Sequence, residues 1–263
     1  MGILNVTPDS FADGGVHCDV DRAVEAGIRM VAEGADILDV GGESTRPGAD
    51  PLPADEELRR VLPVVERLAP RVNVPISIDT YKASVARAAV AGGAAIINDI
   101  SGLQYDPELA RVAAETGAAL ILMHTRGRSS GMYDLAVYDD VAADVARELE
   151  QAIERATRAG VPRDSIVIDP GFGFAKRAEH SYDVLARLDT LAALDRPILS
   201  GPSQKSFLKA ALGDREPSER EWGTAAAVAA SVLLGAHIVR VHGVREMVDV
   251  VRVADRIRDA ATD

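Results

Sequence analysis

The sequence predicts a closed (β/α)8 barrel, in which eight parallel strands and their following helices alternate along the chain. Three observations predict this fold. Eight short apolar runs alternate with segments of helical periodicity, glycines separate helices from the strands that follow, and polar residues stand at the strand ends. An open doubly wound sheet is the alternative. Its strand ends lie along a line, however, where most of these polar groups would share no ligand.

The eight predicted strands are short and rich in Ile, Val and Leu. Such nearly continuous apolar runs are typical of a parallel sheet that is covered on both faces. The runs span residues 2–5, 35–40, 75–79, 94–98, 118–123, 165–169, 197–200 and 236–242.

Helical periodicity is clearest in residues 19–33, 55–68 and 141–159. Glycines lie just after helical segments and before the next strands, at positions 34, 92, 93, 117 and 160. Glycine there adopts the left-handed conformation that ends a helix. These positions therefore support a chain of strand–helix units.

Polar residues stand at or just past the carboxyl ends of the strands. In a barrel these ends meet at one mouth, so we expect their side chains to converge there. Three long strand-to-helix loops, over residues 7–18, 41–53 and 125–138, belong to the same face. No linker interrupts the series, so we expect one domain over residues 1–263. The polar residues are Asn5, Asp39, Asp79, Asn98, His124, Asp169, Ser200 and His242.

Composition excludes several classes of function. Aromatic residues make up only 4% of the chain against 47% hydrophobic residues, so the core is aliphatic. The net charge of −12 argues against a nucleic-acid partner, which needs a basic face. No apolar run approaches the roughly 20 residues that span a bilayer. Cys18 is the one cysteine, so no internal disulfide forms and we expect a cytoplasmic protein. We expect His17 and Cys18 to lie in a loop, without a second pair to complete a zinc site.

Six segments carry a specific pattern, and each lies at a predicted strand end. They are NVTPDSF (5–11), GGESTRPG (41–48), SIDT (77–80), NDISG (98–102), DPGFGF (169–174) and RVH (240–242). Together and in this order they resemble the motifs of the dihydropteroate synthases over nearly the whole chain. The resemblance implies an enzyme of folate synthesis that joins 7,8-dihydropterin-6-ylmethyl diphosphate to p-aminobenzoate and releases pyrophosphate. It also implies a homodimer and competition by sulfonamides.

A pterin presents an edge with several hydrogen-bond donors and acceptors. Asp79, Asn98 and Asp169 would converge on it from three strands, since carboxylates accept ring N–H bonds well. The alternative is that these groups cap helices or turns. Met123 would form the floor of the pterin site, or else belong to the core.

The resemblance assigns further contacts around the second substrate. Lys205 would contact the pterin, and Ser206 would hold the carboxylate of p-aminobenzoate at a helix start. Pro47 and Phe174 would sandwich its ring, although Phe174 is equally compatible with core packing. The alternative for Lys205 is a solvated surface lysine. Gln204 departs from the family pattern, which has Arg there, so one positive charge is missing beside this anion site.

A diphosphate needs a positively charged cradle. The resemblance implies that Thr45, Arg46, Arg240 and His242 form it, since Arg pairs with phosphate oxygens bidentately. The alternative for Arg240 is a structural ion pair. Asn5 resembles the family's ligand for Mg²⁺, which needs few protein oxygens beside water and phosphate; otherwise it caps its loop.

The reaction that the resemblance implies depends on positioning and electrostatics. Asp79, Lys205 and Arg240 would be its catalytic residues, and no Ser or Cys with a partnered base indicates a covalent intermediate. Gly243 is a second departure, because the family often has Asp or Asn there, and we expect a changed local turn. Two other functions stay open. One is a methyltetrahydrofolate-dependent methyltransferase, which the 44–47 segment disfavours, and the other is a non-catalytic pterin-binding paralogue, which Gln204 keeps open.

Overall fold

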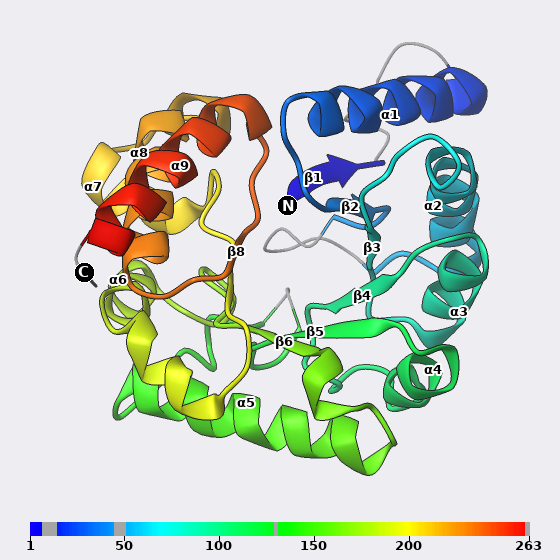
Figure 1. Cartoon of the computed structure of the whole chain (residues 1–263). Helices are drawn as coiled ribbons and strands as arrows, with labels where there is room; N and C mark the ends of the chain where they lie inside the picture. The colour runs from blue at the N-terminus through cyan, green and yellow to red at the C-terminus, as the bar shows by residue number, and fades with distance from the viewer. Residues whose placement is uncertain (7–14, 45–50, 129–130, 261–263) are drawn as a thin grey trace.

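All eight predicted strands form, and they surround one central axis with the helices outside them (Figure 1). The computed structural model describes residues 1–6, 15–44, 51–128 and 131–260. The strands are β1 (Gly2–Asn5), β2 (Leu38–Gly41), β3 (Ile76–Asp79), β4 (Ile96–Asp99), β5 (Ala119–Met123), β6 (Ile166–Asp169), β7 (Leu199–Ser200) and β8 (Ile238–Val239).

Parallel pairing runs around the whole ring and closes it. Strands β1 to β6 form one parallel sheet in chain order, and β7 pairs with β8. A bridge between Ile168 and Ile198 joins the two sheets on one side. On the other side Gly2 bridges to Val241, whose carbonyl accepts a 2.9 Å bond from the Ile3 amide. The predicted closed barrel is confirmed, and the alternative of an open sheet is excluded.

The helices form the outer layer (Figure 1). They are α1 (Gly15–Ala32), α2 (Ala54–Leu68), α3 (Ala83–Ala91), α4 (Glu108–Thr116), α5 (Val141–Arg158), α6 (Ala178–Ala186), α7 (Lys209–Leu212), α8 (Glu221–Leu233) and α9 (Val244–Ala260), with 3-10 turns η2 (Arg163–Ser165), η3 (Leu188–Leu194), η4 (Ser206–Leu208) and η5 (Pro217–Arg220). Because α1 already begins at Gly15, His17 and Cys18 lie in a helix, and the prediction of a loop there was wrong. Nothing between Gly15 and Asp19 breaks a helix, so the periodic segment extends by one turn.

The two-residue period of a strand sorts its side chains between two apolar layers. Outward residues such as Val40, Ile78, Leu120 and Ile168 pack in the large core beneath the helices. Inward residues nearer the amino-terminal ends of the strands form a small apolar plug inside the barrel. The plug consists of Met1, Ile121 and Leu199, with Ile37, Ile96, Val167 and Ile238 packed against it.

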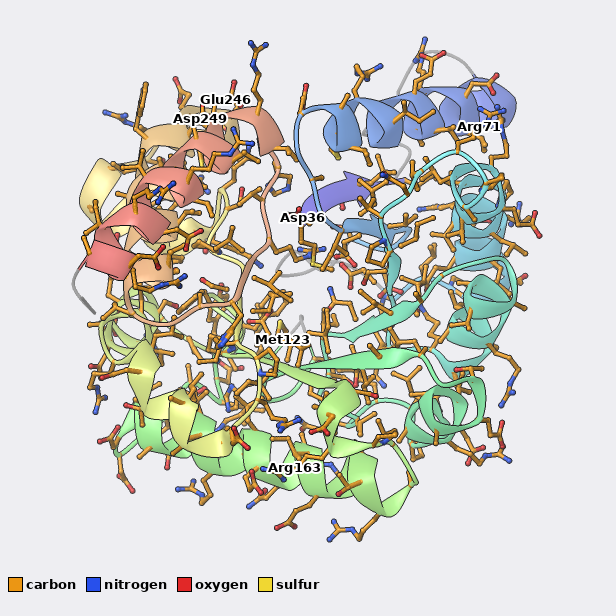
Figure 2. The ribbon with its side chains drawn as sticks, in the orientation of Figure 1. Asp36, Arg71, Met123, Arg163, Glu246 and Asp249 are labelled. Carbon is orange, nitrogen blue, oxygen red and sulfur yellow. The ribbon has the colours of Figure 1, made fainter. Side chains whose placement is uncertain are left out.

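Charged side chains populate the outside of the ring, as Arg71 and Arg163 illustrate, whereas Met123 lies inside it (Figure 2). Among the helices of the described residues, none has the length and apolar character needed to cross a membrane.

Candidate active site

On several strands, the inward position at the carboxyl end carries a polar group. Asp79 follows Ser77, Asn98 follows Ile96, Asp169 follows Val167 and Arg240 follows Ile238 at the same two-residue spacing. These residues line one pocket at the carboxyl ends of the strands, so the predicted convergence is observed. Its lining is Asp79, Asn98, Ile100, Met123, Asp169, Gly171, Phe172, Phe174, Gly201, Lys205 and Arg240.

Asp39 lies at the centre of the polar contacts in the barrel. Its Oδ2 accepts from Arg240 Nε over 2.6 Å and from Asn98 Nδ2 over 3.1 Å. Arg240 Nη2 in turn donates to Asp79 Oδ2 over 2.7 Å. The ion pair that was the alternative for Arg240 is therefore present, and it lies inside the pocket. Burial raises the pKa of Asp79 to about 7; Arg240 opposes this shift and the Asp39 carboxylate adds to it.

Asp169 ends β6 and fixes the start of the following loop. Its Oδ1 accepts a 2.7 Å bond from the amide of Gly171. Burial raises the pKa of this carboxyl, although the Gly171 amide and the cation of Lys205 oppose the shift. The site thus holds two buried carboxyl groups, Asp39 and Asp169, and the partly buried Asp79 around the cations Arg240 and Lys205.

Lys205 reaches the pocket from the turn after β7. Its Nζ lies 4.1 Å from the centre of the Phe174 ring, a cation–π contact. Burial and then the charge of Arg240 lower its pKa to about 8. The solvated lysine that was the alternative is thus not observed. Its neighbour Ser206 is exposed at the start of η4.

The turn before Lys205 is held in an uncommon conformation. Gln204 has φ 58°, its amide donates to Thr224 Oγ1 over 3.0 Å, and its carbonyl accepts from Arg220 over 2.8 Å. Arg220 is buried and also binds the carbonyl of Arg215. The buried Arg220 therefore holds the backbone of this turn and does not replace the charge that Gln204 lacks.

The diphosphate cradle is described only in part. His242 is half-buried, and its Nδ1 lies 2.9 Å from Ser203 Oγ. Thr45, Arg46 and Pro47 lie outside the described residues. Asn5 is exposed at the carboxyl end of β1, on the rim to which the pocket opens. Among the described residues no three His, Cys, Asp or Glu side chains gather as a metal site.

Two strand-end residues that the sequence predicts at the mouth face the helices instead. Ser200 is buried, and its Oγ lies 2.8 Å from Ser231 Oγ on α8. His124 lies one position past Met123, so the strand alternation turns its ring toward α5. Its Nε2 lies 2.9 Å from Glu148 Oε2.

Two residues of this region were not predicted as site residues. Asp39 is recognisable as a strand-end carboxylate, but nothing in the sequence indicates its contact with Arg240. Lys176 follows the DPGFGF segment and is only 1% exposed. A lysine in a loop is normally solvated, so the sequence carried no signal for its burial.

The departure at Gly243 has a local explanation in packing. A Cβ at this position would lie 2.6 Å from Glu221 Oε1 and 3.4 Å from Glu246 Oε2. The carboxylate of Glu221 therefore occupies the space that a side chain at 243 would need.

Comparison with known proteins identifies similar sequences and structures. The family model for pterin binding enzymes matches residues 1–242. The chain is 47% identical over 255 residues to a dihydropteroate synthase of Escherichia coli, covering 97% of this chain and 90% of the relative. It is similar to the structure of Xanthomonas albilineans dihydropteroate synthase with 4-aminobenzoic acid, with a TM-score of 0.92 and 44% identity over 98% of this chain and 92% of that one. It also resembles a sulfonamide complex of the Yersinia pestis enzyme, with a TM-score of 0.92 and 43% identity over 98% and 94% of the two chains.

Proposed function

This chain belongs to the pterin-binding enzymes and among them to the dihydropteroate synthases, and we propose that its strand-end pocket is where both substrates react. The enzyme condenses 7,8-dihydropterin-6-ylmethyl diphosphate with p-aminobenzoate, which yields 7,8-dihydropteroate and pyrophosphate. One observation carries the assignment of the site. Five side chains expected to contact the pterin line a single pocket with Arg240: Asp79, Asn98, Met123, Asp169 and Lys205.

The pterin lies against the carboxylates. Asp169 keeps Oδ1 on Gly171, so Oδ2 is the oxygen that accepts a ring N–H bond. Asn98 donates one amide hydrogen to Asp39, which orients its carbonyl oxygen toward the ligand. Met123 supplies the apolar floor, and Lys205 closes the pocket across from it.

The aromatic substrate lies against Phe174, with Pro47 as the second wall and Ser206 beside its carboxylate. Its amine nitrogen forms a bond to the pterin methylene carbon while the C–O bond to the diphosphate breaks. Pyrophosphate leaves with the electron pair, and the nitrogen loses one proton. Asp79 stabilises positive charge that develops on the pterin, and Arg240 holds Asp79 in place for this role.

The leaving group gathers negative charge, which this chain balances with cations at the rim. Arg240 reaches the pocket from β8, and Thr45, Arg46 and His242 complete the cradle. Asn5 fits a sparse Mg²⁺ site, because one neutral, exposed oxygen at the rim holds this ion only together with water and substrate oxygens. When bound, Mg²⁺ would neutralise charge on the departing pyrophosphate.

We further propose that two copies pair through α8 and α9. These helices carry exposed apolar side chains on the outside of the barrel: Trp222, Leu233, Val253 and Ile257. The double variant Val253→Asp/Ile257→Asp should be monomeric by light scattering where the parent chain is dimeric. A parent chain that is monomeric at all concentrations would contradict this pairing.

The test of the function is release of pyrophosphate, measured with and without p-aminobenzoate. The proposal requires release that depends on both substrates and that a sulfonamide suppresses. A non-catalytic paralogue binds the pterin diphosphate without releasing pyrophosphate. A methyltransferase, in contrast, shows neither release nor dependence on p-aminobenzoate.

A further inference from the structure

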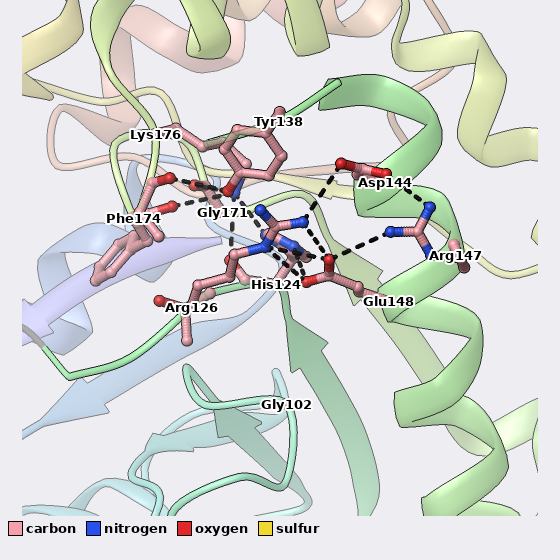
Figure 3. A network of polar contacts seen from close by, with 12 residues as sticks. Gly102, His124, Arg126, Tyr138, Asp144, Arg147, Glu148, Gly171, Phe174 and Lys176 are labelled. Carbon is pink, nitrogen blue, oxygen red and sulfur yellow. Dashed lines mark hydrogen bonds and ion pairs between the residues drawn. The ribbon is translucent and has the colours of Figure 1, made fainter. Parts of the chain in front are cut away.

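A second lysine lies fully buried beside the pocket and outside the proposed catalytic set. Lys176 stands between β6 and α6, and its Nζ lies 2.7 Å from His124 Nδ1 (Figure 3). The same nitrogen donates to the carbonyl of Gly171 over 3.2 Å and to that of Phe174 over 3.1 Å. A lysine nitrogen can only donate hydrogen bonds. Nδ1 of His124 and the two carbonyl oxygens therefore accept from Nζ in all three contacts.

The loop that Lys176 binds contains three residues with positive φ, of which only Ala175 is in a conformation that its residue type disfavours. Gly171, Gly173 and Ala175 all have positive φ, at 69°, 77° and 49°. For a residue with a Cβ, such as Ala175, this costs about 1–2 kcal/mol. Because every second residue from 171 to 175 has positive φ, carbonyls of this loop face neighbouring side chains. Hydrogen bonds from those side chains hold the carbonyls in place.

Two tyrosines from the segment between β5 and α5 provide part of these contacts. Tyr133 Oη donates to the carbonyl of Gly173 over 3.3 Å, and Tyr138 Oη donates to that of Ala175 over 2.8 Å. Lys176 binds the carbonyls of Gly171 and Phe174. Of these three side chains it alone reaches two carbonyls, and it also connects them to His124.

His124 extends the contact to α5. Burial, with the nearby charge of Lys176, lowers the pKa of His124 to about 4, so the ring is neutral at pH 7. Although burial raises it, hydrogen bonds from His124 and Arg126 bring the pKa of Glu148 to about 2. Nε2–H therefore donates to the Glu148 carboxylate, and Nδ1 accepts from Lys176. The hydrogen bonds form one directed series from the loop to α5.

The loop that Lys176 binds forms one wall of the pocket. Gly171, Phe172 and Phe174 line it, and Phe174 packs with Met123, Met132 and Ala175 in a small apolar cluster. The proposed pterin ligands Asp79 and Asn98 lie on strands, where barrel pairing already fixes them. The wall formed by Phe174 has no such pairing and depends on its loop.

We propose that Lys176, oriented by His124 and Glu148, is a positioning residue that holds the Phe174 wall and so sets affinity for p-aminobenzoate. This inference rests on the proposed function, because it takes Phe174 as the wall of the aminobenzoate site. It assigns no contact between Lys176 and either substrate. The expected signature is a selective change in the Michaelis constant for the aromatic amine.

The test compares Lys176→Met with Lys209→Met, a matched control whose lysine is exposed and pairs with Asp214 at the surface. Methionine fits the buried stem but donates no hydrogen bond, so the Phe174 carbonyl loses its contact with Lys176 and the Gly171 carbonyl keeps only the amide of Phe174. Losing such contacts at the wall should raise the KM for p-aminobenzoate about tenfold. The Kd of the pterin diphosphate by calorimetry and the kcat should each stay within about threefold. The control should match the parent chain.

A second variant decides the question if Lys176→Met does not fold. Glu148 is a quarter exposed on α5, so Glu148→Gln keeps its shape and removes the charge that orients His124. The KM for p-aminobenzoate should then rise about threefold, with pterin affinity unchanged. An unchanged KM in the folded variants would overturn the proposal, as would an equal loss of pterin affinity. Failure of the proposed function is distinct, because the parent chain itself would then release no pyrophosphate.

Discussion

Arg240 donates a hydrogen bond from Nη2 to Oδ2 of Asp79 over 2.7 Å, so the last strand of the barrel holds a carboxylate of the third. The two residues lie 161 positions apart in the chain, and only closure of the barrel brings them together. Asp39 accepts from the same guanidinium. This triad combines the charges that the proposed reaction needs at the pterin and at the leaving group.

Asp39 should control activity without contacting a substrate. In Asp39→Asn the group keeps its size but loses the charge that binds Arg240 and Asn98. A charge-assisted hydrogen bond contributes about 1.5–3 kcal/mol, so kcat/KM for the pterin diphosphate should fall about ten- to a hundredfold. Steady-state kinetics measures this, with the exposed Asp249→Asn as control. An unchanged kcat/KM would show that Asp39 only fills the barrel.

The pH profile of kcat/KM reports groups of the free enzyme. Asp79, with a pKa of about 7, carries the negative charge that stabilises the pterin only when ionised, so kcat/KM should fall as the pH drops below about 7. Lys205, with a pKa of about 8, is cationic only below that value, so kcat/KM should fall again above it. In Asp79→Asn the acid limb should disappear while the alkaline limb remains. An acid limb that survives in this variant belongs to another group.

Gly171 should tolerate no side chain. It has φ 69°, and a Cβ there would lie 2.1 Å from the carbonyl oxygen of His124. Gly117 is a matched control, because it has φ 73° but nothing within 4 Å of the same position. Gly117→Ala should lower the free energy of unfolding by about 1–2 kcal/mol, from backbone strain alone. Gly171→Ala should cost at least about 2 kcal/mol more, since strand β5 must shift. Urea denaturation that gives equal losses would exclude the clash.

Gln204 should limit affinity for the carboxylate of p-aminobenzoate. Gln204→Arg restores the positive charge that the family pattern has at this turn, beside Lys205 and Ser206. The KM for p-aminobenzoate and the inhibition constant of a sulfonamide should both fall by about three- to tenfold, as for one added surface-exposed charge contact. If kinetic titration finds both constants unchanged, position 204 takes no part in anion binding.

The barrel and most of its mouth could be predicted from the sequence because both depend on local periodicity. Strand length and alternation determine that Asp79, Asn98 and Asp169 point inward once the apolar plug is inward. The same rule explains the two wrong placements. Ser200 and His124 also stand at strand ends, but each follows an inward residue, Leu199 or Met123, so the alternation turns it outward.

Contacts between distant segments could not be predicted. Asp39 and Arg240 are 201 positions apart, and no pattern in either segment indicates their pairing. Burial of Lys176 depends on carbonyls that three left-handed residues turn inward, and the sequence shows only the two glycines. The positive φ of Ala175 carries no signal at all, because alanine seldom adopts it.

Binding of the pterin diphosphate, measured by calorimetry on the parent chain, Asp169→Asn and Lys205→Ala, tests the strand-end pocket most directly. Both residues line the pocket, and circular dichroism should show that each variant stays folded. The pocket assignment predicts tight binding to the parent chain and no measurable heat of binding for either folded variant. Unchanged affinity in both would place the pterin elsewhere and contradict the assignment.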